Sequence, residues 1–305
     1  MTDIILRPPT RHQIRAAKIS SQIALEPPEQ ISFQHTVLCQ TSMPYRNQGD
    51  NVREWERVQG NVYLRIEAGA ARHPGQNQWV KLGLPYGSKP RLVLMHLNAE
   101  ALKQGTPLIE VEDSFTAFIR RIQDPLKLGK SGPNGEEFRA FKDQLTRLAV
   151  ATVRLALSTE VRSFQVNSHI IDAFDLWLVK DERQRVFWPS IVRMNDRYFE
   201  SLQKHAVPLD ERALAALSNS PVALDLYAWL AQRLHRVSKK QFITWVSLKE
   251  QFGQGYSRMD NFKRMFRHNL MMVYLQYNAA RMEDGDNGLT LYHSPPPIRK
   301  LLKRL

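Results

Sequence analysis

The sequence predicts an α+β fold made of two winged-helix domains in tandem behind an N-terminal helical arm. Three patterns support this prediction. Residues 257–277 carry apolar side chains at helical spacing on one face and basic or amide side chains on the other. Two shorter helix patterns precede this segment, and a hairpin pattern follows it. Residues 88–158 repeat that order of elements while sharing little sequence with it.

The composition limits the class of protein. The chain has 305 residues, of which 43% are hydrophobic and 24% are charged, as in a globular protein of about two domains. Its net charge of +13 favours an acidic partner, either nucleic acid or an anionic membrane surface. No apolar run approaches the roughly 20 residues that a membrane span needs, so no membrane partner is expected. Cys39 is the only cysteine, which excludes an intrachain disulfide and fits the reducing cytoplasm.

The expected arm and its linker occupy residues 1–50. A helix pattern covers residues 10–25, and Pro27 and Pro28 are followed by a polar tract that ends at residues 47–50. We interpret this tract as a linker to the body of the protein. Two roles stay open for the helix, which either packs on the first domain or contacts a second copy or another partner.

The first winged-helix domain, with extra strands, is expected at residues 51–205. Its predicted elements are strands at 62–66 and 80–84, a helix at 88–103, a strand at 108–111, a helix capped by Asp113 or Ser114, a helix at 136–158, and short strands at 164–166, 174–179, 185–192 and 197–202. In the helix at 136–158, Arg147 and Arg154 fall opposite the apolar face and Arg139 lies at its side. These three arginines are candidate phosphate contacts.

The second winged-helix domain is expected at residues 206–305. Its predicted elements are a helix at 210–217, a helix with Ser220 as N-cap and Pro221 as first residue, a helix opened by the capping box at 247–250 and ended by Gly253, the long helix at 257–277, and a hairpin with strands at 280–283 and 289–292. Residues 221–305 hold fourteen Lys and Arg against six Asp and Glu, which is +8 of the net charge. A basic domain of this kind is expected to bind nucleic acid.

The long helix is the predicted DNA-recognition helix, opened by a capping pair of Ser257 and Asp260. Its buried face is expected to consist of Met259, Phe262, Phe266, Leu270 and Val273. The opposite face carries Asn261, Arg264 and His268, flanked by Lys263 and Arg267. The local pattern leaves one alternative, a helical hairpin whose charged face is merely solvated.

Asn261 and Arg264 are the predicted base contacts, because they lie one turn apart near the start of the helix, where side chains reach deepest into the major groove. Asn suits adenine and Arg suits guanine in bidentate pairs. His268 is a further candidate on the same face. The remaining candidates for phosphate contact in this domain are Arg258, Lys263, Arg267 and Arg281.

The motifs of replication enzymes are absent from the sequence. No G-x-x-x-x-G-K-[ST] loop occurs, and no two histidines lie one residue apart as in the metal site of rolling-circle nickases. We therefore expect no catalytic residues, no metal and no cofactor. The protein is predicted not to be an enzyme.

Several segments resemble the plasmid-encoded RepA replication-initiator family. They are LPYGSKPRLVLMHLNAEA at 84–101, SFTAFIRRI at 114–122, EEFRAFKDQLTRL at 136–148, VALDLYAWLAQRL at 222–234, WVSLKEQFGQGYSRMDNFKRMF at 245–266 and GLTLYHSPPPI at 288–298. The most specific pieces are LKEQFG at 248–253 and Ser294 with the three prolines after it. The chain departs from the family pattern at residues 130–135, KSGPNG, so the contacts of that loop are not carried over. Residues 1–60 match nothing.

The resemblance implies a bacterial initiator that binds repeated sites in a plasmid origin and helps load the host's replication machinery. The expected partners are therefore double-stranded DNA and host replication proteins, and a homodimer stays open. Two other functions remain: a winged-helix repressor of its own or a neighbouring promoter, and an unrecognised nuclease.

Overall fold

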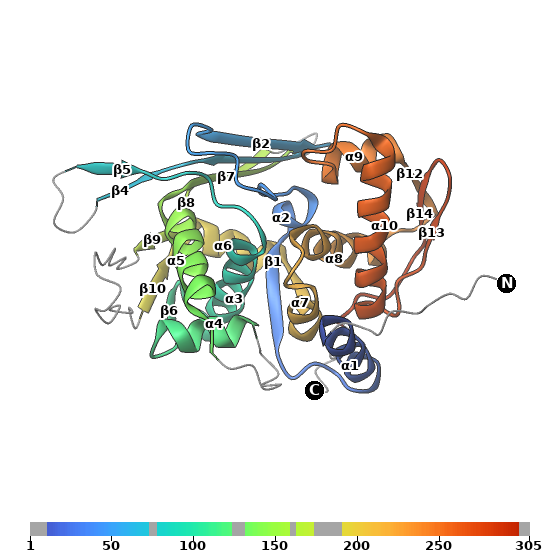
Figure 1. The fold of residues 1–305 in the computed structure, drawn as a ribbon, viewed down its shortest axis with the longest axis horizontal. Coiled ribbons are helices and arrows are strands. Elements are labelled where there is room, and N and C mark those ends of the chain that lie inside the picture. The colour runs from blue at the N-terminus through green and yellow to red at the C-terminus, as the bar shows by residue number, and fades with distance from the viewer. Residues whose placement is uncertain (1–10, 73–77, 124–131, 159–162, 174–190, 299–305) are drawn as a thin grey trace.

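The structure is a computed structural model that describes residues 11–72, 78–123, 132–158, 163–173 and 191–298. Figure 1 shows two halves along the long axis of the molecule, with β1 (Ile31–His35) and α2 (Thr36–Gln40) between them. The first half contains the elements from β2 to α6, and the second half those from β11 to β14. The buried apolar side chains form a continuous cluster that runs through both halves.

The first half has a mixed architecture. Its elements are β2 (Glu54–Gln59), β3 (Val62–Glu67), β4 (Ala70–Arg72), β5 (Trp79–Lys81), α3 (Ser88–Gln104), β6 (Leu108–Glu110), α4 (Phe115–Gln123), α5 (Gly135–Val150), β7 (Thr152–Ser158), β8 (Ser163–His169), β9 (Ile171–Ala173), β10 (Ile191–Met194) and α6 (Asp196–His205). Antiparallel sheets form in the orders β2-β3-β7-β8 and β6-β10-β9, beside the two-stranded ribbon β4-β5. The predicted helix at 88–103 and the strands at 62–66 and 108–111 are confirmed.

The predicted helix at 136–158 is too long. It ends at Val150 as α5, and residues 152–158 form strand β7 instead. The reason lies in the side-chain period, since Val153 and Leu155 alternate with less buried residues and face the core of a sheet. That period of two, satisfied by pairing with β3, overrides the helical spacing of the same residues.

A second correction concerns residues 197–202, for which the sequence pattern predicts a strand but which lie in α6. Asn195 caps this helix, because its side chain accepts a hydrogen bond from the backbone nitrogen of Tyr198. Tyr198, Phe199 and Leu202 then share a buried helical face. The strand expected at 174–179 lies outside the described residues, as does most of the one at 185–192.

The second half follows the predicted order closely. Its elements are β11 (Ala206–Asp210), α7 (Glu211–Leu217), α8 (Pro221–Arg233), the 3-10 turn η1 (Leu234–Arg236), β12 (Gln241–Thr244), α9 (Trp245–Phe252), α10 (Met259–Gln276), β13 (Met282–Asp284) and β14 (Gly288–Leu291). Ser220 caps α8 and Pro221 begins it, as predicted. A three-stranded antiparallel sheet forms in the order β12-β14-β13.

Two predicted caps in this half are wrong. Helix α9 begins earlier than the capping box at 247–250, because Thr244, at the end of β12, already accepts a hydrogen bond from Ser247 N. Helix α10 has Arg258 at its N-cap without a side-chain cap, and Asp260 instead pairs with Arg258. The first residue of each helix is therefore set by the strand or turn that precedes it.

The N-terminal segment packs on the second half. Helix α1 (Arg11–Leu25) contacts α7 and α10, and Gln276 Nε2 donates a hydrogen bond of 3.2 Å to Ala16 O. Residues 31–40, expected to lie in a linker, instead form β1 and α2, and β1 pairs with β11. The expectation of a linker rests on polarity, but Gln34 and His35 are polar residues that the fold buries.

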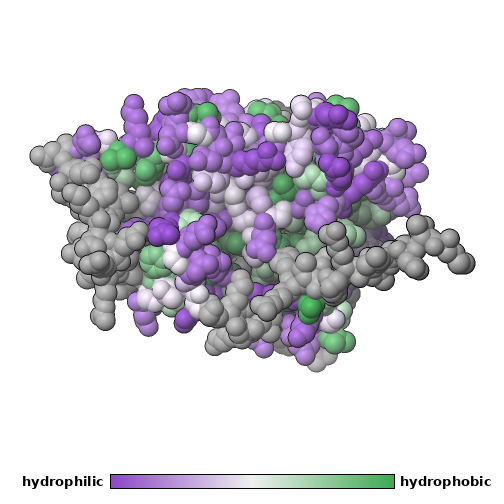
Figure 2. Space-filling view, in the orientation of Figure 1, coloured by the Kyte–Doolittle hydropathy of each residue, from purple (hydrophilic) through white to green (hydrophobic). Residues whose placement is uncertain are grey.

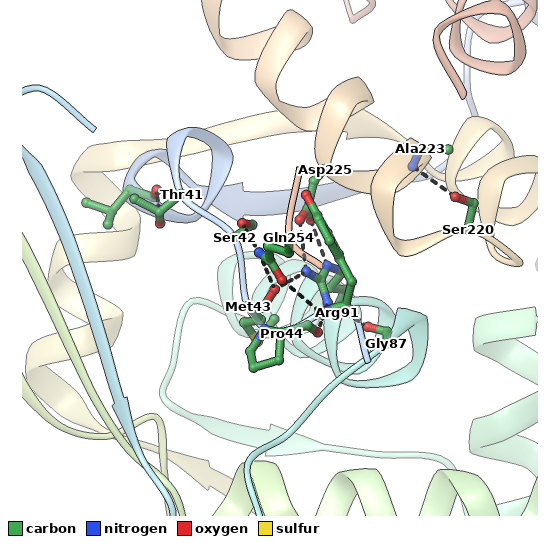
Figure 3. Close-up of polar contacts among 12 residues, drawn as sticks. Thr41, Ser42, Met43, Pro44, Gly87, Arg91, Ser220, Ala223, Asp225 and Gln254 are labelled. Atoms are coloured by element: carbon green, nitrogen blue, oxygen red, sulfur yellow. Dashed lines mark hydrogen bonds and ion pairs between the residues drawn. The ribbon is translucent and has the colours of Figure 1, made fainter. Parts of the chain in front are cut away.

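A buried ion pair joins the two halves (Figure 3). The guanidinium of Arg91 in α3, only 1% exposed, donates to both carboxylate oxygens of Asp225 in α8, at 2.7 and 2.9 Å. It also donates to the carbonyl oxygens of Met43, Pro44 and Gly87. Burial raises the pKa of the Asp225 carboxyl, and Arg91 opposes that rise. The pair thus fixes α3, α8 and residues 43–44 against one another.

Candidate nucleic-acid interface

An aromatic cluster holds α10 in place. Phe262 and Phe266 are fully buried, and their rings meet the indole of Trp245 edge-on at centroid distances of 6.3 and 5.6 Å. Ser220, the N-cap of α8, donates a hydrogen bond of 2.6 Å to Asn269 Oδ1 in α10. The predicted buried face of the helix is confirmed, with Met259 at its partly buried edge. The opposite face of α10 is therefore presented rigidly to solvent.

An open groove of about 570 Å³ runs beside the first turns of α10. Its lining consists of Arg46, Gly255, Tyr256, Ser257, Asn261, Arg264, Met265 and His268. Three of the predicted site residues, Asn261, Arg264 and His268, are thereby brought together. Arg264 is exposed, and its Nη2 donates a hydrogen bond of 2.9 Å to Asn261 Oδ1. We call this feature the α10 groove.

The far wall of the α10 groove comes from the N-terminal segment. The exposed guanidinium of Arg46 lies 5.5 Å from the ring centre of Tyr256. Gln254 holds this segment, because its Oε1 accepts from Tyr45 N at 3.1 Å and its Nε2 donates to Ser42 Oγ at 2.7 Å (Figure 3). Sequence reasoning missed Arg46, since no local pattern connects residue 46 to a turn about 200 residues later.

Lys263 and Arg267 lie on the other side of α10, against the hairpin β13-β14. Arg267 makes two hydrogen bonds to the carboxylate of Asp284, at 2.7 and 3.2 Å, and Lys263 Nζ donates to Asp286 O at 3.0 Å. Both cations also lie over the indole of Trp245, at 5.3 and 5.0 Å from its ring centre. These two side chains position the hairpin, and their expected role as phosphate contacts stays a prediction.

The other two predicted phosphate contacts of the second half lie beyond the two ends of α10. Arg258, before the first turn of α10, pairs with Asp260 at 2.7 Å, and this hydrogen bond lowers the pKa of the Asp260 carboxyl to about 2. Arg281 is exposed at the start of the hairpin, where its backbone nitrogen donates to Ser294 Oγ. Figure 2 shows hydrophilic side chains gathered over the first turns of α10 and the hairpin.

The three arginines of the first half do not share one surface. Arg139 is exposed on α5, but the side chain of Arg147 is only 12% exposed and pairs with Asp143 and Asp50. Arg154 lies in β7, not in a helix, and pairs with Glu67 across the sheet. The prediction that Arg147 and Arg154 lie on one solvent face of a helix is wrong, because the chain leaves the helix at Val150.

In the described part of the chain, no group of three or more His, Cys, Asp or Glu side chains is placed to hold a metal ion. None of the helices within those residues is long and apolar enough to cross a bilayer.

The sequence of residues 84–247, more than half of the chain, matches the family described as plasmid encoded RepA protein. The chain belongs to this RepA family. The resemblance found in its sequence segments is confirmed by this match. The matched residues end in the first turn of α9, so α10 and the hairpin lie beyond them.

Solved structures show a related fold. Crystal structures of domains 2 and 3 of RctB are similar to this RepA chain at 10% and 12% identity, with TM-scores of 0.50 and 0.46. The first comparison covers 90% of this chain and 97% of the other, and the second covers 90% and 94%. At this identity the likeness concerns the fold alone. No sequence among curated proteins matches the chain.

Proposed function

We propose that this RepA chain is a bacterial, cytoplasmic plasmid replication initiator that binds repeated duplex sequences at the plasmid origin and helps recruit host replication proteins. Membership of the plasmid-encoded RepA family supports the replication role. The α10 groove is the observation that carries DNA binding, since it gathers Arg46, Asn261, Arg264 and His268 beside a rigid helix. Recruitment of host proteins rests on the family alone, and whether the chain binds as a homodimer stays open.

The second half is interpreted as a winged-helix domain. Its order of helix, strand, helix, long helix and hairpin is the order of that fold, and β12-β14-β13 supplies the small sheet. In this interpretation α10 is the recognition helix and β13-β14 is the wing. The wing carries Glu283, Asp284 and Asp286, so we assign the phosphate contacts to the α10 groove and not to the tip of the wing.

Within the groove, Arg264 and Asn261 are the proposed base contacts and Arg46 a proposed phosphate contact. Arg264 and Asn261 lie on the exposed side of the first two turns of α10, which is the part of a recognition helix that reaches base edges. Arg46 lies on the opposite wall of the α10 groove, where the phosphate backbone of a bound DNA strand would run. His268 is placed one turn further along the same wall as Arg264.

Selection from a library of randomised duplexes, followed by affinity measurements at one salt concentration, tests this proposal. We expect Arg264→Ala to weaken binding to the selected sequence by about 5- to 150-fold and binding to a scrambled duplex far less, because a bidentate base contact contributes about 1–3 kcal/mol of discrimination. Arg46→Ala is expected to weaken both about equally. Arg193→Ala, an exposed arginine on β10, is the matched control. Equal losses on both duplexes for Arg264→Ala would reduce it to a backbone contact.

A footprint separates an initiator from a repressor. An initiator is expected to protect several direct repeats spaced near whole helical turns, whereas a symmetric repressor dimer protects one inverted repeat. Incubation of supercoiled plasmid with the protein and Mg²⁺ or Mn²⁺ tests the nuclease alternative. Nicked product would overturn the assignment as a non-enzyme.

A further inference from the structure

The ribbon β4-β5 extends from the body of the first half, at the opposite end of the long axis from α10 (Figure 1). Its strands pair in the register Ala70 with Lys81, Ala71 with Val80 and Arg72 with Trp79. Because side chains alternate between the faces of a strand, and paired residues share a face, Arg72, Trp79 and Lys81 project on the same face. We call this the basic face of the ribbon.

The basic face has an unusual composition. The side chains of Arg72 and Lys81 are exposed, and Trp79 is 70% exposed although it is among the largest apolar residues. No Asp or Glu occurs in the sequence between Ala68 and Lys81, so the formal charge of this stretch is positive. An exposed aromatic ring between two cations is suited to a nucleic acid, which offers both phosphates and base or sugar surfaces.

The base of the ribbon is fixed, which gives the basic face a defined direction. The half-buried guanidinium of Arg53 donates to Leu82 O at 2.5 Å, to Gly69 O at 2.9 Å and to Ala68 O, and thus ties both strands together. Gly69 packs on the end of α5 so closely that a Cβ there would lie 1.9 Å from Val150 O. The ribbon is therefore anchored on the end of α5 and not on a loose loop.

We propose that the basic face of the ribbon is a second contact with duplex DNA, outside the site that α10 reads. A two-stranded antiparallel ribbon fits a DNA groove, and Arg72 and Lys81 would contact phosphates on either side of Trp79. This inference rests on the proposed DNA binding by α10, because the ribbon engages DNA that the α10 groove has already bound. Its position at the far end of the long axis makes it a contact with flanking sequence.

The salt dependence of binding to a 40-base-pair duplex that carries the selected sequence at its centre tests the inference. Each phosphate that the protein neutralises adds about −0.9 to the slope of log K against log salt, so Arg72→Ala/Lys81→Ala is expected to make the slope less negative by about 2. The double variant should also bind about tenfold more weakly at 0.1 M salt. Trp79→Ala should weaken binding several-fold with an unchanged slope, because its contact is not ionic.

The control is Lys103→Ala/Arg193→Ala, which removes two exposed cations away from the ribbon. Circular dichroism checks that each variant is folded. If the ribbon variants bind like the wild type while Arg264→Ala binds more weakly, the ribbon inference is overturned and the proposed function stands. If the wild-type protein does not bind the duplex at low salt, the proposed function itself fails.

Discussion

In the first half a buried helix, a short strand, two further helices and a strand follow one another as α3, β6, α4, α5 and β7, and in the second half as α8, β12, α9, α10 and β13. The strand after the long helix takes a different path in each half. In the second half β13 and β14 fold back and pair with β12. In the first half β7 joins β3 in another sheet, and β6 pairs with β10.

This difference decides what the long helix can do. The end of α5 is covered by the base of the ribbon, where Gly69 meets Val150, and Arg147 is held by two carboxylates. The start of α10 is left open, because its hairpin docks on the Lys263 side and leaves Arg264 exposed. The same order of elements therefore gives a long helix that is covered at its end in the first half and a candidate binding surface at the start of the long helix in the second half.

The largest expected effect comes from removing one partner of the buried ion pair between the two halves. Asp225→Ala leaves the buried Arg91 without its partner and is expected to cost about 3–5 kcal/mol of unfolding free energy. Urea denaturation followed by circular dichroism and tryptophan fluorescence measures it. The control is Arg91→Met/Asp225→Leu, which removes both charges and should recover part of the loss, because the carbonyl oxygens of residues 43, 44 and 87 still lose their donor. Two separated transitions in the wild-type protein would show that the halves unfold independently.

A matched pair of core substitutions sharpens the comparison. Phe266→Ala in α10 and Phe141→Ala in α5 each remove a fully buried ring and are expected to cost about 3–5 kcal/mol. Because the apolar core is continuous, each variant should shift the same thermal transition. A Phe266→Ala variant that kept its melting temperature but lost DNA binding would mean that α10 faces the other way.

A pH effect is expected at the seam between the halves. Burial, with His205 nearby, lowers the pKa of His35 from 6.5 to about 3, and His35 Nε2 lies 2.8 Å from Ser201 Oγ. Between about pH 3 and pH 6.5, His35 is protonated in the unfolded chain but neutral in the folded chain. The free energy of unfolding therefore falls as the pH drops below about 6.5. The loss at pH 5 relative to pH 7 is about 2 kcal/mol. His35→Gln should lack this component, whereas the exposed His293→Gln control should keep it.

The smallest expected effect comes from removing a single acidic residue, and it compares the influence of the hairpin and of the first-half sheet on DNA affinity. Asp284→Ala breaks a half-exposed ion pair and should change unfolding free energy by less than about 1 kcal/mol. DNA affinity at low salt should rise a few-fold, because a negative charge beside α10 is removed. Glu67→Ala, which releases Arg154 in β7, is the counterpart and should leave DNA affinity unchanged. An equal rise for Glu67→Ala would place the first-half sheet at the DNA as well.

Local patterns sufficed for the helices whose caps and apolar faces agree, such as α8 after Ser220 and α10 with Phe262 and Phe266. They failed where two periods compete, as at residues 152–158, because pairing with β3 is a tertiary choice. They also placed Lys263 and Arg267 correctly on the flank of α10, but they did not predict that this flank contacts the hairpin.

The candidate site was predictable only in part for the same reason. Asn261, Arg264 and His268 follow from the helical period alone, and the structure brings them to one groove. Arg46 and the acidic neighbours of Arg267 depend on chain segments that are distant in sequence. No pattern within a window of one or two turns contains that information.

The packing of α1 against α7 and α10 has a consequence for synthesis. Roughly 250 residues separate α1 from the end of α10, so a ribosome that adds about 5–20 residues per second makes the partner of α1 on the order of 10–50 s after α1 itself. Strand β1 is likewise made before β11, the strand with which it pairs. Helix α1, whose Ala16 and Ile19 are buried in the finished protein, lacks α10 throughout this interval. Helix α1 is thus made long before α10, one of the two helices on which it packs.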